Sequence, residues 1–143
     1  MEQKDYILRE IEKIGMVLRA ILKKLTGSSD NPAIQIEKQF EETKEMLASQ
    51  MDFDLEDFIA QNEADSMHYL SQFKGINLEN IESLSKVLMQ MGLQSDSTHK
   101  KTYLEKALNL FIYCNQTDKT FSFEREENIA LITNELRVLS KDQ

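Results

Sequence analysis

Hydrophobic residues recur along the first part of the chain at the spacing of one face of an α-helix. Between Tyr6 and Leu25 they are separated by alternating steps of four and three residues, which is the periodicity of an amphipathic helix. We therefore expect residues 1–26 to form the longest amphipathic helix, against which the other helices pack. The residues of this apolar stripe are Ile7, Ile11, Ile14, Leu18, Ile21 and Leu25.

Capping residues indicate helix boundaries along the rest of the chain. Side chains of Asn, Asp and Ser accept hydrogen bonds from the first free N–H groups of a helix. We expect Gly27 to end the first helix in a left-handed conformation, Met51 to end the second, and Gly92 to end the helix before the last two. A break at Gln61-Asn62 divides residues 54–73 into two short helices or leaves one kinked helix. The residues expected to begin helices are Asn31 with Pro32 at the first helical position, Asp54, Asn77, Asp96 and Ser122.

The same pattern predicts an all-α protein. Nowhere do β-branched residues alternate with polar ones between turn signals, as they do in half-buried strands. We expect six or seven helices in a single domain spanning 1–143, with the N-terminal helix packed against helical hairpins. Short connections predict that the three helices of residues 77–140 are antiparallel neighbours.

Composition narrows the functional classes. The 143 residues are 41% hydrophobic and 29% charged, with four glycines and one proline, which fits a soluble helical domain. The net charge of −8 argues against nucleic-acid binding, since phosphates require clustered Lys and Arg. We find no signal peptide and no apolar run of the roughly 20 residues that a membrane span needs. Cys114 is the only cysteine, so the sequence predicts no internal disulfide and a cytoplasmic location.

Charge is unevenly distributed between two segments. Residues 1–26 contain six basic and four acidic side chains, net +2, whereas residues 37–65 contain ten acids and two lysines, net −8. The structural interpretation is that the acidic helices pack beside the basic face of the first helix, although surface ion pairs add only about 0–1 kcal/mol each. The functional interpretation is an acidic surface that attracts a basic partner.

Two resemblances add context. The segment from Tyr103 to Phe111, followed by Cys114, resembles the second helix of a tetratricopeptide repeat, with Ala107, Phe111 and Cys114 at its small and aromatic positions. This resemblance implies a helical hairpin and no repeat array, because no second copy recurs at a period of about 34 residues. The segments from Gln3 to Glu12 and from Lys119 to Arg125 are similar to small all-helical bacterial proteins of unknown function. That similarity implies a bacterial cytoplasm and no particular site.

One acidic stretch has the spacing of a calcium-binding loop. Asp52, Asp54, Glu56 and Glu63 fall at the first, third, fifth and twelfth positions of an EF-hand loop. Asp57 stands at the sixth position, where the sharp turn requires glycine. We interpret these acids as cap and first-turn residues of a helix.

A second candidate metal site consists of two Asp-x-x-His spacings. Each spacing places a carboxylate and an imidazole one helical turn apart, as in di-metal helical bundles that use Glu-x-x-His. Asp96 also fits a helix cap, which would leave His99 in an exposed first turn. We keep a metal-dependent enzyme as an alternative, although we expect no metal and no cofactor. Its ligands would be Asp65, His68, Asp96 and His99, with Glu41 and Glu45 as further acids.

No motif of covalent catalysis stands out. Cys114 lies on an apolar stripe beside Phe111, which is typical of a core cysteine. The chain has no glycine-rich phosphate loop and no serine-centred nucleophile elbow. We therefore expect a protein that is not an enzyme.

The first helix suggests a role in protein contact. Its stripe lasts under three heptads and is widened by Leu8, Val17 and Leu22, which favours burial by several neighbours over a two-stranded coiled coil. We expect a protein–protein interaction or self-association module whose partner is a protein of unknown identity or a second copy, with the stripe Ile7, Ile11, Ile14, Leu18, Ile21 and Leu25 as interaction surface. Binding of the helix to a membrane surface is a weaker alternative, because four acids reduce its attraction to anionic lipids.

Overall fold

Seven α-helices form the part of the chain that the structure describes. The computed structural model describes residues 2–27 and 32–141, and it contains no strand within these ranges. The all-α prediction is confirmed. The helices are α1 (Glu2–Thr26), α2 (Pro32–Met51), α3 (Leu55–Ala60), α4 (Glu63–Ser71), α5 (Leu78–Gln94), α6 (Ser97–Thr117) and α7 (Phe123–Lys141).

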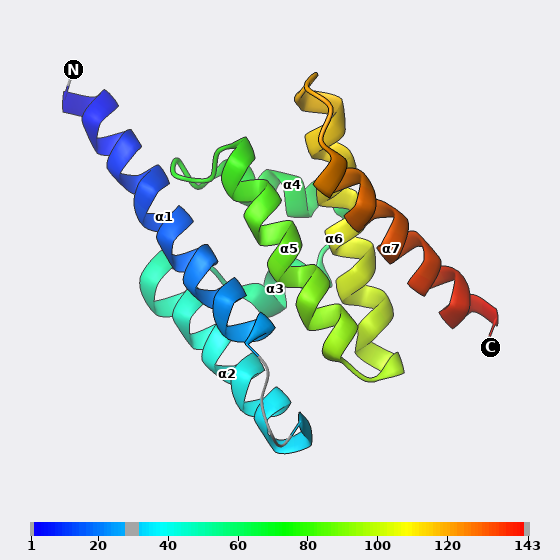
Figure 1. Ribbon diagram of the computed structural model, residues 1–143. Coiled ribbons are helices and arrows are strands. Elements are labelled where there is room, and N and C mark those ends of the chain that lie inside the picture. Colours follow the sequence, from blue (N-terminus) through cyan, green and yellow to red (C-terminus); the bar gives the residue numbers. More distant parts are fainter. Residues whose placement is uncertain (1, 28–31, 142–143) are drawn as a thin grey trace.

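Four of the helices lie side by side in one layer. Figure 1 shows α1, α5, α6 and α7 in this order across the molecule, with α6 antiparallel to both α5 and α7. The antiparallel arrangement expected for the last three helices is therefore confirmed. α2 runs back along α1, and α2, α3 and α4 together cover one face of the layer.

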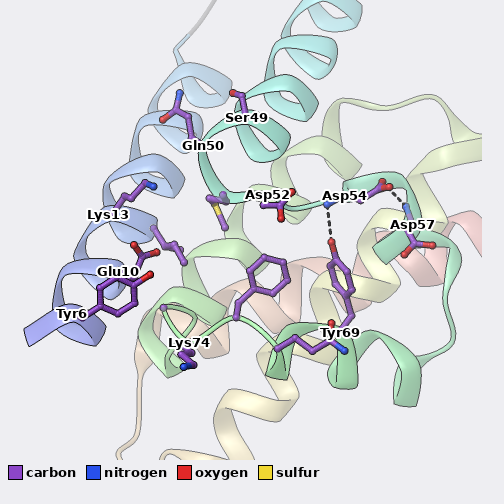
Figure 2. A pocket seen from close by; sticks show the side chains of 15 residues that line it. Tyr6, Glu10, Lys13, Ser49, Gln50, Asp52, Asp54, Asp57, Tyr69 and Lys74 are labelled. Atoms are coloured by element: carbon purple, nitrogen blue, oxygen red, sulfur yellow. Dashed lines mark hydrogen bonds between the residues drawn. The ribbon is translucent and has the colours of Figure 1, made fainter. Parts of the chain in front are cut away.

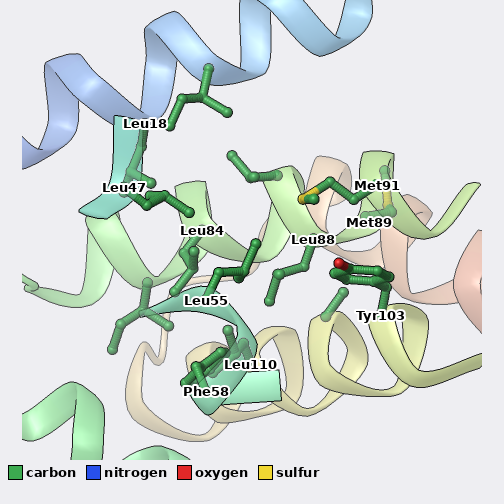
Figure 3. Packing of buried hydrophobic residues seen from close by; sticks show 14 of the residues in the cluster. Leu18, Leu47, Leu55, Phe58, Leu84, Leu88, Met89, Met91, Tyr103 and Leu110 are labelled. Atoms are coloured by element: carbon green, nitrogen blue, oxygen red, sulfur yellow. The ribbon is translucent and has the colours of Figure 1, made fainter. Parts of the chain in front are cut away.

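The centre of the hydrophobic core is α5. Its Leu84 and Leu88 have no exposed surface, and Figure 3 shows them between Leu18 of α1 and Leu110 of α6. Burial of a leucine side chain stabilises a fold by roughly 1.5–3 kcal/mol. One hydrophobic cluster includes residues from all seven helices, so each helix contributes to the same core.

Two side chains of α5 hold it in parallel register with α1. The amide of Asn80 donates hydrogen bonds to the backbone carbonyls of Ile11 (2.9 Å) and Gly75 (2.7 Å). Near the other end of α5, the amide of Gln94 donates to the carbonyl of Leu25 (2.8 Å). Since Ile11 precedes Leu25 in α1 as Asn80 precedes Gln94 in α5, the two helices run in the same direction.

Four of the predicted helix caps are confirmed. The side chains of Asp54, Asn77 and Asp96 each accept a hydrogen bond from the N–H three residues later, at 3.0, 3.0 and 3.2 Å. The hydroxyl of Ser122 accepts the equivalent bond of α7 at 3.2 Å. The fifth predicted cap, Asn31, lies outside the described residues, whereas α2 begins at Pro32 as expected.

Two glycines act differently from the predictions. None of the described glycines has a positive φ, so Gly27 does not end α1 in a left-handed conformation; its N–H instead donates to the carbonyl of Lys23 (2.9 Å). α5 continues past Gly92 to Gln94. A Cβ atom at Gly92 would lie 2.8 Å from Cδ2 of Leu104, so glycine here permits close packing of α5 on α6.

The chain between α2 and α5 forms two separate short helices. The side chain of Asn62 begins α4 by accepting a hydrogen bond from the N–H of Asp65 (2.8 Å), which resolves the choice between two helices and one kinked helix. Four aromatic rings with centroids between 5.3 and 6.3 Å apart pack this corner together. They are Phe53, Phe58, Tyr69 and Phe73.

Candidate functional site

A cleft of about 900 Å³ separates the first half of α1 from the helices α2, α3 and α4 (Figure 2). Most of the side chains that line it are polar or charged. Small-molecule sites are usually enclosed and mainly apolar, so this lining is more typical of contact with a macromolecule. The side chains labelled in Figure 2 are Tyr6, Glu10, Lys13, Ser49, Gln50, Asp52, Asp54, Asp57, Tyr69 and Lys74.

Close packing between α1 and the segment before α5 closes one end of the cleft. A Cβ atom at Gly75 would lie 2.6 Å from Cδ1 of Ile14 and 2.8 Å from the backbone of Glu10. Only glycine can approach the helix backbone so closely. The position of Gly75 therefore fixes the distance between the α1 wall and the α4 wall.

The opposite wall of the cleft is shaped by the turn that follows α2. Asp52 has a φ of 55°, the left-handed region that residues other than glycine seldom adopt. The next residues are held by two hydrogen bonds drawn in Figure 2, from the N–H of Asp54 to the hydroxyl of Tyr69 (2.8 Å) and from the N–H of Asp57 to the carboxylate of Asp54 (3.0 Å). The carboxylates of Asp52, Asp54 and Asp57 are exposed along this segment, and that of Asp54 caps the start of α3.

Carboxylates outnumber ammonium groups around the cleft. Four acids face two lysines, and three of the acids belong to the acidic segment 37–65. The excess of acids favours cations over anions at the cleft. The acids are Glu10, Asp52, Asp54 and Asp57, and the lysines are Lys13 and Lys74.

The ion pairs of the acidic segment lie on other parts of its surface. Lys24 of α1 pairs with Glu42 of α2, as the charge complementarity of the two segments predicted. Lys44 pairs with Glu56 at 2.9 Å and with Glu41 at 3.6 Å. The contact with Glu56 raises the pKa of Lys44, so this lysine stays charged.

The apolar stripe of α1 is mostly covered by the chain itself. Ile11 is half-buried, and Ile7 has 36% of its surface exposed. The prediction of one continuous interaction surface is therefore corrected at the four covered positions, which are core residues because α2 and α5 pack on them. These four residues and their exposed fractions are Ile14 (4%), Leu18 (1%), Ile21 (0%) and Leu25 (3%).

The first turns of α1 extend past the start of α5. Asn80, near the beginning of α5, is level with Ile11, so no residue of α5 lies beside residues 4–8. Tyr6 and Leu8 in these turns are 59% and 54% exposed. This uncovered end of α1 adjoins the cleft, because Tyr6 also lines it.

The two Asp-x-x-His pairs do not combine into a metal site. Asp65 and His68 lie in α4, whereas Asp96 and His99 lie at the start of α6. Across residues 2–27 and 32–141, no three His, Cys, Asp or Glu side chains come together in a group that could hold a metal ion. His99 instead contacts the capping carboxylate of Asp96 at 3.2 Å, and this contact with the cap hydrogen bond lowers the pKa of Asp96. The metal-dependent alternative therefore has no assembled ligand set in the described structure.

Cys114 occupies the core position that the sequence indicates. It has no exposed surface, and burial raises the pKa of its thiol to about 11. A thiol with such a pKa is protonated at neutral pH and is a poor nucleophile. Its neighbours in the tetratricopeptide-like pattern, Ala107 and Phe111, are also fully buried.

Two buried cations were not singled out by the sequence. Lys106 is 8% exposed, and its ammonium group donates to the backbone carbonyl of Gln61 and to the hydroxyl of Ser66, both at 2.5 Å. Arg125 is 3% exposed and donates two hydrogen bonds to the carboxylate of Glu82, at 2.9 and 3.1 Å. Lys106 lies between Tyr103 and Leu110 on the apolar stripe of α6, and Arg125 lies one turn before the α7 stripe; a cation at helical spacing from apolar residues is the signal by which each could have been found.

Comparisons with family models, with curated proteins and with solved structures gave no match to this chain. In the described ranges, none of the helices combines the length and the apolar character needed to cross a membrane.

Proposed function

We propose that this chain is a protein–protein contact module that binds a basic segment of a partner in the cleft between α1 and α2–α4. The observation that carries the proposal is the cleft itself, about 900 Å³ in volume, with four carboxylates around a mainly polar lining. Complementary charge increases the rate of association and selects the partner. The same acids disfavour a nucleic-acid partner.

The shape of the cleft supports a macromolecular ligand. Its two walls belong to segments far apart in the sequence, and both present side chains that reach the opening (Figure 2). Tyr6 and Phe73 add aromatic surface to the charged lining, a combination common at protein interfaces. A partner segment that carries Lys or Arg beside an apolar residue would match both features.

The proposal is tested by adding positive charge to the cleft. Gln50 is exposed and lines the cleft, so Gln50→Lys adds a charge there without removing an acid. Proteins captured from native cell extract by the wild-type chain are purified, and their affinity is measured by titration. We expect Gln50→Lys to weaken binding about tenfold, because it repels a basic partner.

The matched control places the same charge elsewhere. Thr102 is an exposed residue of α6 that lies outside the cleft lining, so Thr102→Lys should leave the affinity unchanged. Equal binding by Gln50→Lys and wild type would refute the cleft as the contact surface, as would the failure of the wild-type chain to capture any protein.

Self-association through the start of α1 is a second candidate. It is favoured by the exposure of Tyr6, Ile7 and Leu8, which lie on the part of α1 that extends past the start of α5. Leu8→Asp should convert a dimer into a monomer in light scattering, whereas Met16→Asp, at a residue 59% exposed on another face, should not. A wild-type chain that is monomeric at high concentration would eliminate this candidate.

The proposed role is non-catalytic and belongs to a reducing cytoplasm, where a chain with one buried cysteine needs no disulfide.

The hairpin of α5 and α6 is proposed to pack in the manner of a tetratricopeptide hairpin, with Ala107, Phe111 and Cys114 facing the preceding helix.

A further inference from the structure

The most exposed large apolar side chains of the described structure lie together at the turn between α6 and α7. Phe121 is 67% exposed and Phe123 is 77% exposed. Their ring centroids are 5.0 Å apart, with an angle of 84° between the ring planes, which is the edge-to-face geometry that aromatic pairs prefer. At about 200 Å² per phenylalanine, the pair presents roughly 300 Å² of apolar surface, the size at which patches on monomers are often functional.

The backbone under this aromatic pair is fixed without help from the two rings. Asp118 accepts a hydrogen bond from the N–H of Thr120 (3.0 Å) and a second from the guanidinium of Arg125 (3.3 Å). Ser122, between the two phenylalanines, accepts from the N–H of Arg125 (3.2 Å). Arg125 is buried and bound to Glu82 of α5, so the turn is anchored to the centre of the fold.

This rigidity matters for binding. Aromatic anchors that are held in place before contact lose little conformational entropy when a partner covers them. Since the turn is hydrogen-bonded through Asp118, Ser122 and Arg125, truncation of the rings leaves those bonds intact. The hydrogen bonds of the turn do not involve the two exposed rings, which leaves both rings available for a partner.

The charges around the pair select the kind of partner. Residues 118–127 contain four acids and two basic residues, and one of the basic residues, Arg125, is buried. Asp118 pairs with Arg125, and Glu124 pairs with Lys86 of α5, so the acidic excess next to the rings comes from the exposed Glu126 and Glu127, opposed by the exposed Lys119. The whole chain carries a net charge of −8. Repulsion disfavours both an anionic bilayer and a second copy of this chain, whereas Lys and Arg around an apolar pocket would complement the acids. The four acids are Asp118, Glu124, Glu126 and Glu127.

We propose that Phe121 and Phe123 form a preorganised anchor that inserts into an apolar pocket rimmed by Lys or Arg on a partner protein. This surface belongs to α6 and α7, whereas the cleft belongs to α1–α4, so the proposal stands independently of the function assigned to the cleft.

The test places a photo-crosslinking amino acid at position 123 in the full chain, in the native cell. Its control places the same amino acid at position 131, where Leu131 is 43% exposed on α7. The protein crosslinked at position 123 is identified and purified. Its affinity is then titrated against the wild-type chain, the double variant Phe121→Ala/Phe123→Ala, and the control Leu131→Ala.

We expect an adduct at position 123 that is absent at position 131. The double variant should bind the purified partner at least about tenfold more weakly, as expected for two aromatic anchors, while Leu131→Ala binds as wild type. Circular dichroism and the thermal midpoint of the double variant should equal those of the wild type. Added salt should weaken binding by the wild-type chain, because the partner's rim is cationic.

Several results would overturn the proposal. They are the absence of a protein adduct at position 123, an adduct formed only between two copies of this chain, and equal affinity of the double variant and the wild type. Loss of stability in the double variant would show that the rings serve the fold. Binding of the wild-type chain to phosphatidylserine vesicles that is lost in the double variant would assign the rings to a membrane surface instead.

Discussion

Two corners of the molecule are each joined to the core by one buried cation, in opposite electrostatic settings. Lys106 joins the corner between α3 and α4 to α6 through two neutral oxygens, and its ammonium lies 5.4 Å from the ring centroid of Phe58. Arg125 joins the corner between α6 and α7 to α5 through the carboxylate of Glu82, with Asp118 as a second partner. One cation is therefore solvated by dipoles, and the other is neutralised by charge.

The pKa shifts of the two cations have opposite directions. Burial lowers the pKa of Lys106, and the charge of the Glu63 carboxylate opposes this shift only in part. The hydrogen bonds to Glu82 raise the pKa of Arg125, so its charge is retained at every accessible pH. The difference teaches that burial alone does not make a cation important for stability. The contribution of a buried cation to stability depends on which buried groups lose their partner when the cation is removed.

Arg125→Met should have the largest effect, a loss of about 3 kcal/mol in the free energy of unfolding. The substitution leaves Glu82 without its partner at a site where its side chain is 21% exposed. Chemical denaturation measures the loss, and Arg137→Met, at an exposed residue of the same helix, is the control with little expected change. A loss under about 1 kcal/mol would mean that solvent already screens the pair.

Ionisation of the Cys114 thiol, next to the Arg125 corner, should cause an intermediate loss of stability that depends on pH. Cys114 has its pKa raised from 9.0 to about 11 by burial. The unfolded chain therefore loses this proton first as the pH rises, so stability falls between pH 9 and 11. We expect a loss of about 2 kcal/mol at the upper end of that window.

The measurement for this prediction is the free energy of unfolding of wild type and Cys114→Ala from pH 8 to pH 11. The alanine variant is less stable at pH 8 because it leaves a cavity, but its stability should fall less as the pH rises. Parallel curves for the two proteins would contradict a raised thiol pKa.

Lys106→Met should have the smallest effect, less than about 1.5 kcal/mol in either direction. The variant loses two hydrogen bonds, to the carbonyl of Gln61 and the hydroxyl of Ser66, but it also removes a charge that is costly to bury. Chemical denaturation of Lys106→Met and Arg125→Met under the same conditions compares the two losses in the free energy of unfolding. Equal losses in the two variants would show that neutral oxygens hold a buried cation as well as a carboxylate does.

Local sequence signals were sufficient for most helix boundaries. Asp54, Asn77, Asp96 and Ser122 cap helices because their side chains reach an N–H three residues away, which is a contact within one turn. Gly92 misled because its role depends on Leu104 of another helix. The residues next to a glycine in the sequence do not reveal whether the glycine ends a helix or allows a second helix to pack closely against it.

The functional surfaces were less predictable from the sequence. The charge of segment 37–65 indicated an acidic surface, but the cleft exists only because Gly75 packs on α1 and Asp52 turns the chain after α2. All six residues of the α1 stripe were expected to form an interaction surface, but four of them are buried, because the sequence does not reveal which part of α1 the helices α2 and α5 cover. The exposure of Phe121 and Phe123 likewise depends on tertiary packing, since a buried and an exposed phenylalanine give the same hydrophobic signal.

The salt dependence of partner binding tests the central claim, that an acidic cleft contacts a basic segment, most directly. The dissociation constant of the purified partner captured through the cleft is measured from about 50 to about 300 mM NaCl, where the Debye length shortens from above to below roughly 10 Å. The account predicts that affinity falls about tenfold over this range and that Gln50→Lys reduces the dependence on salt. An affinity that does not change with salt would contradict it.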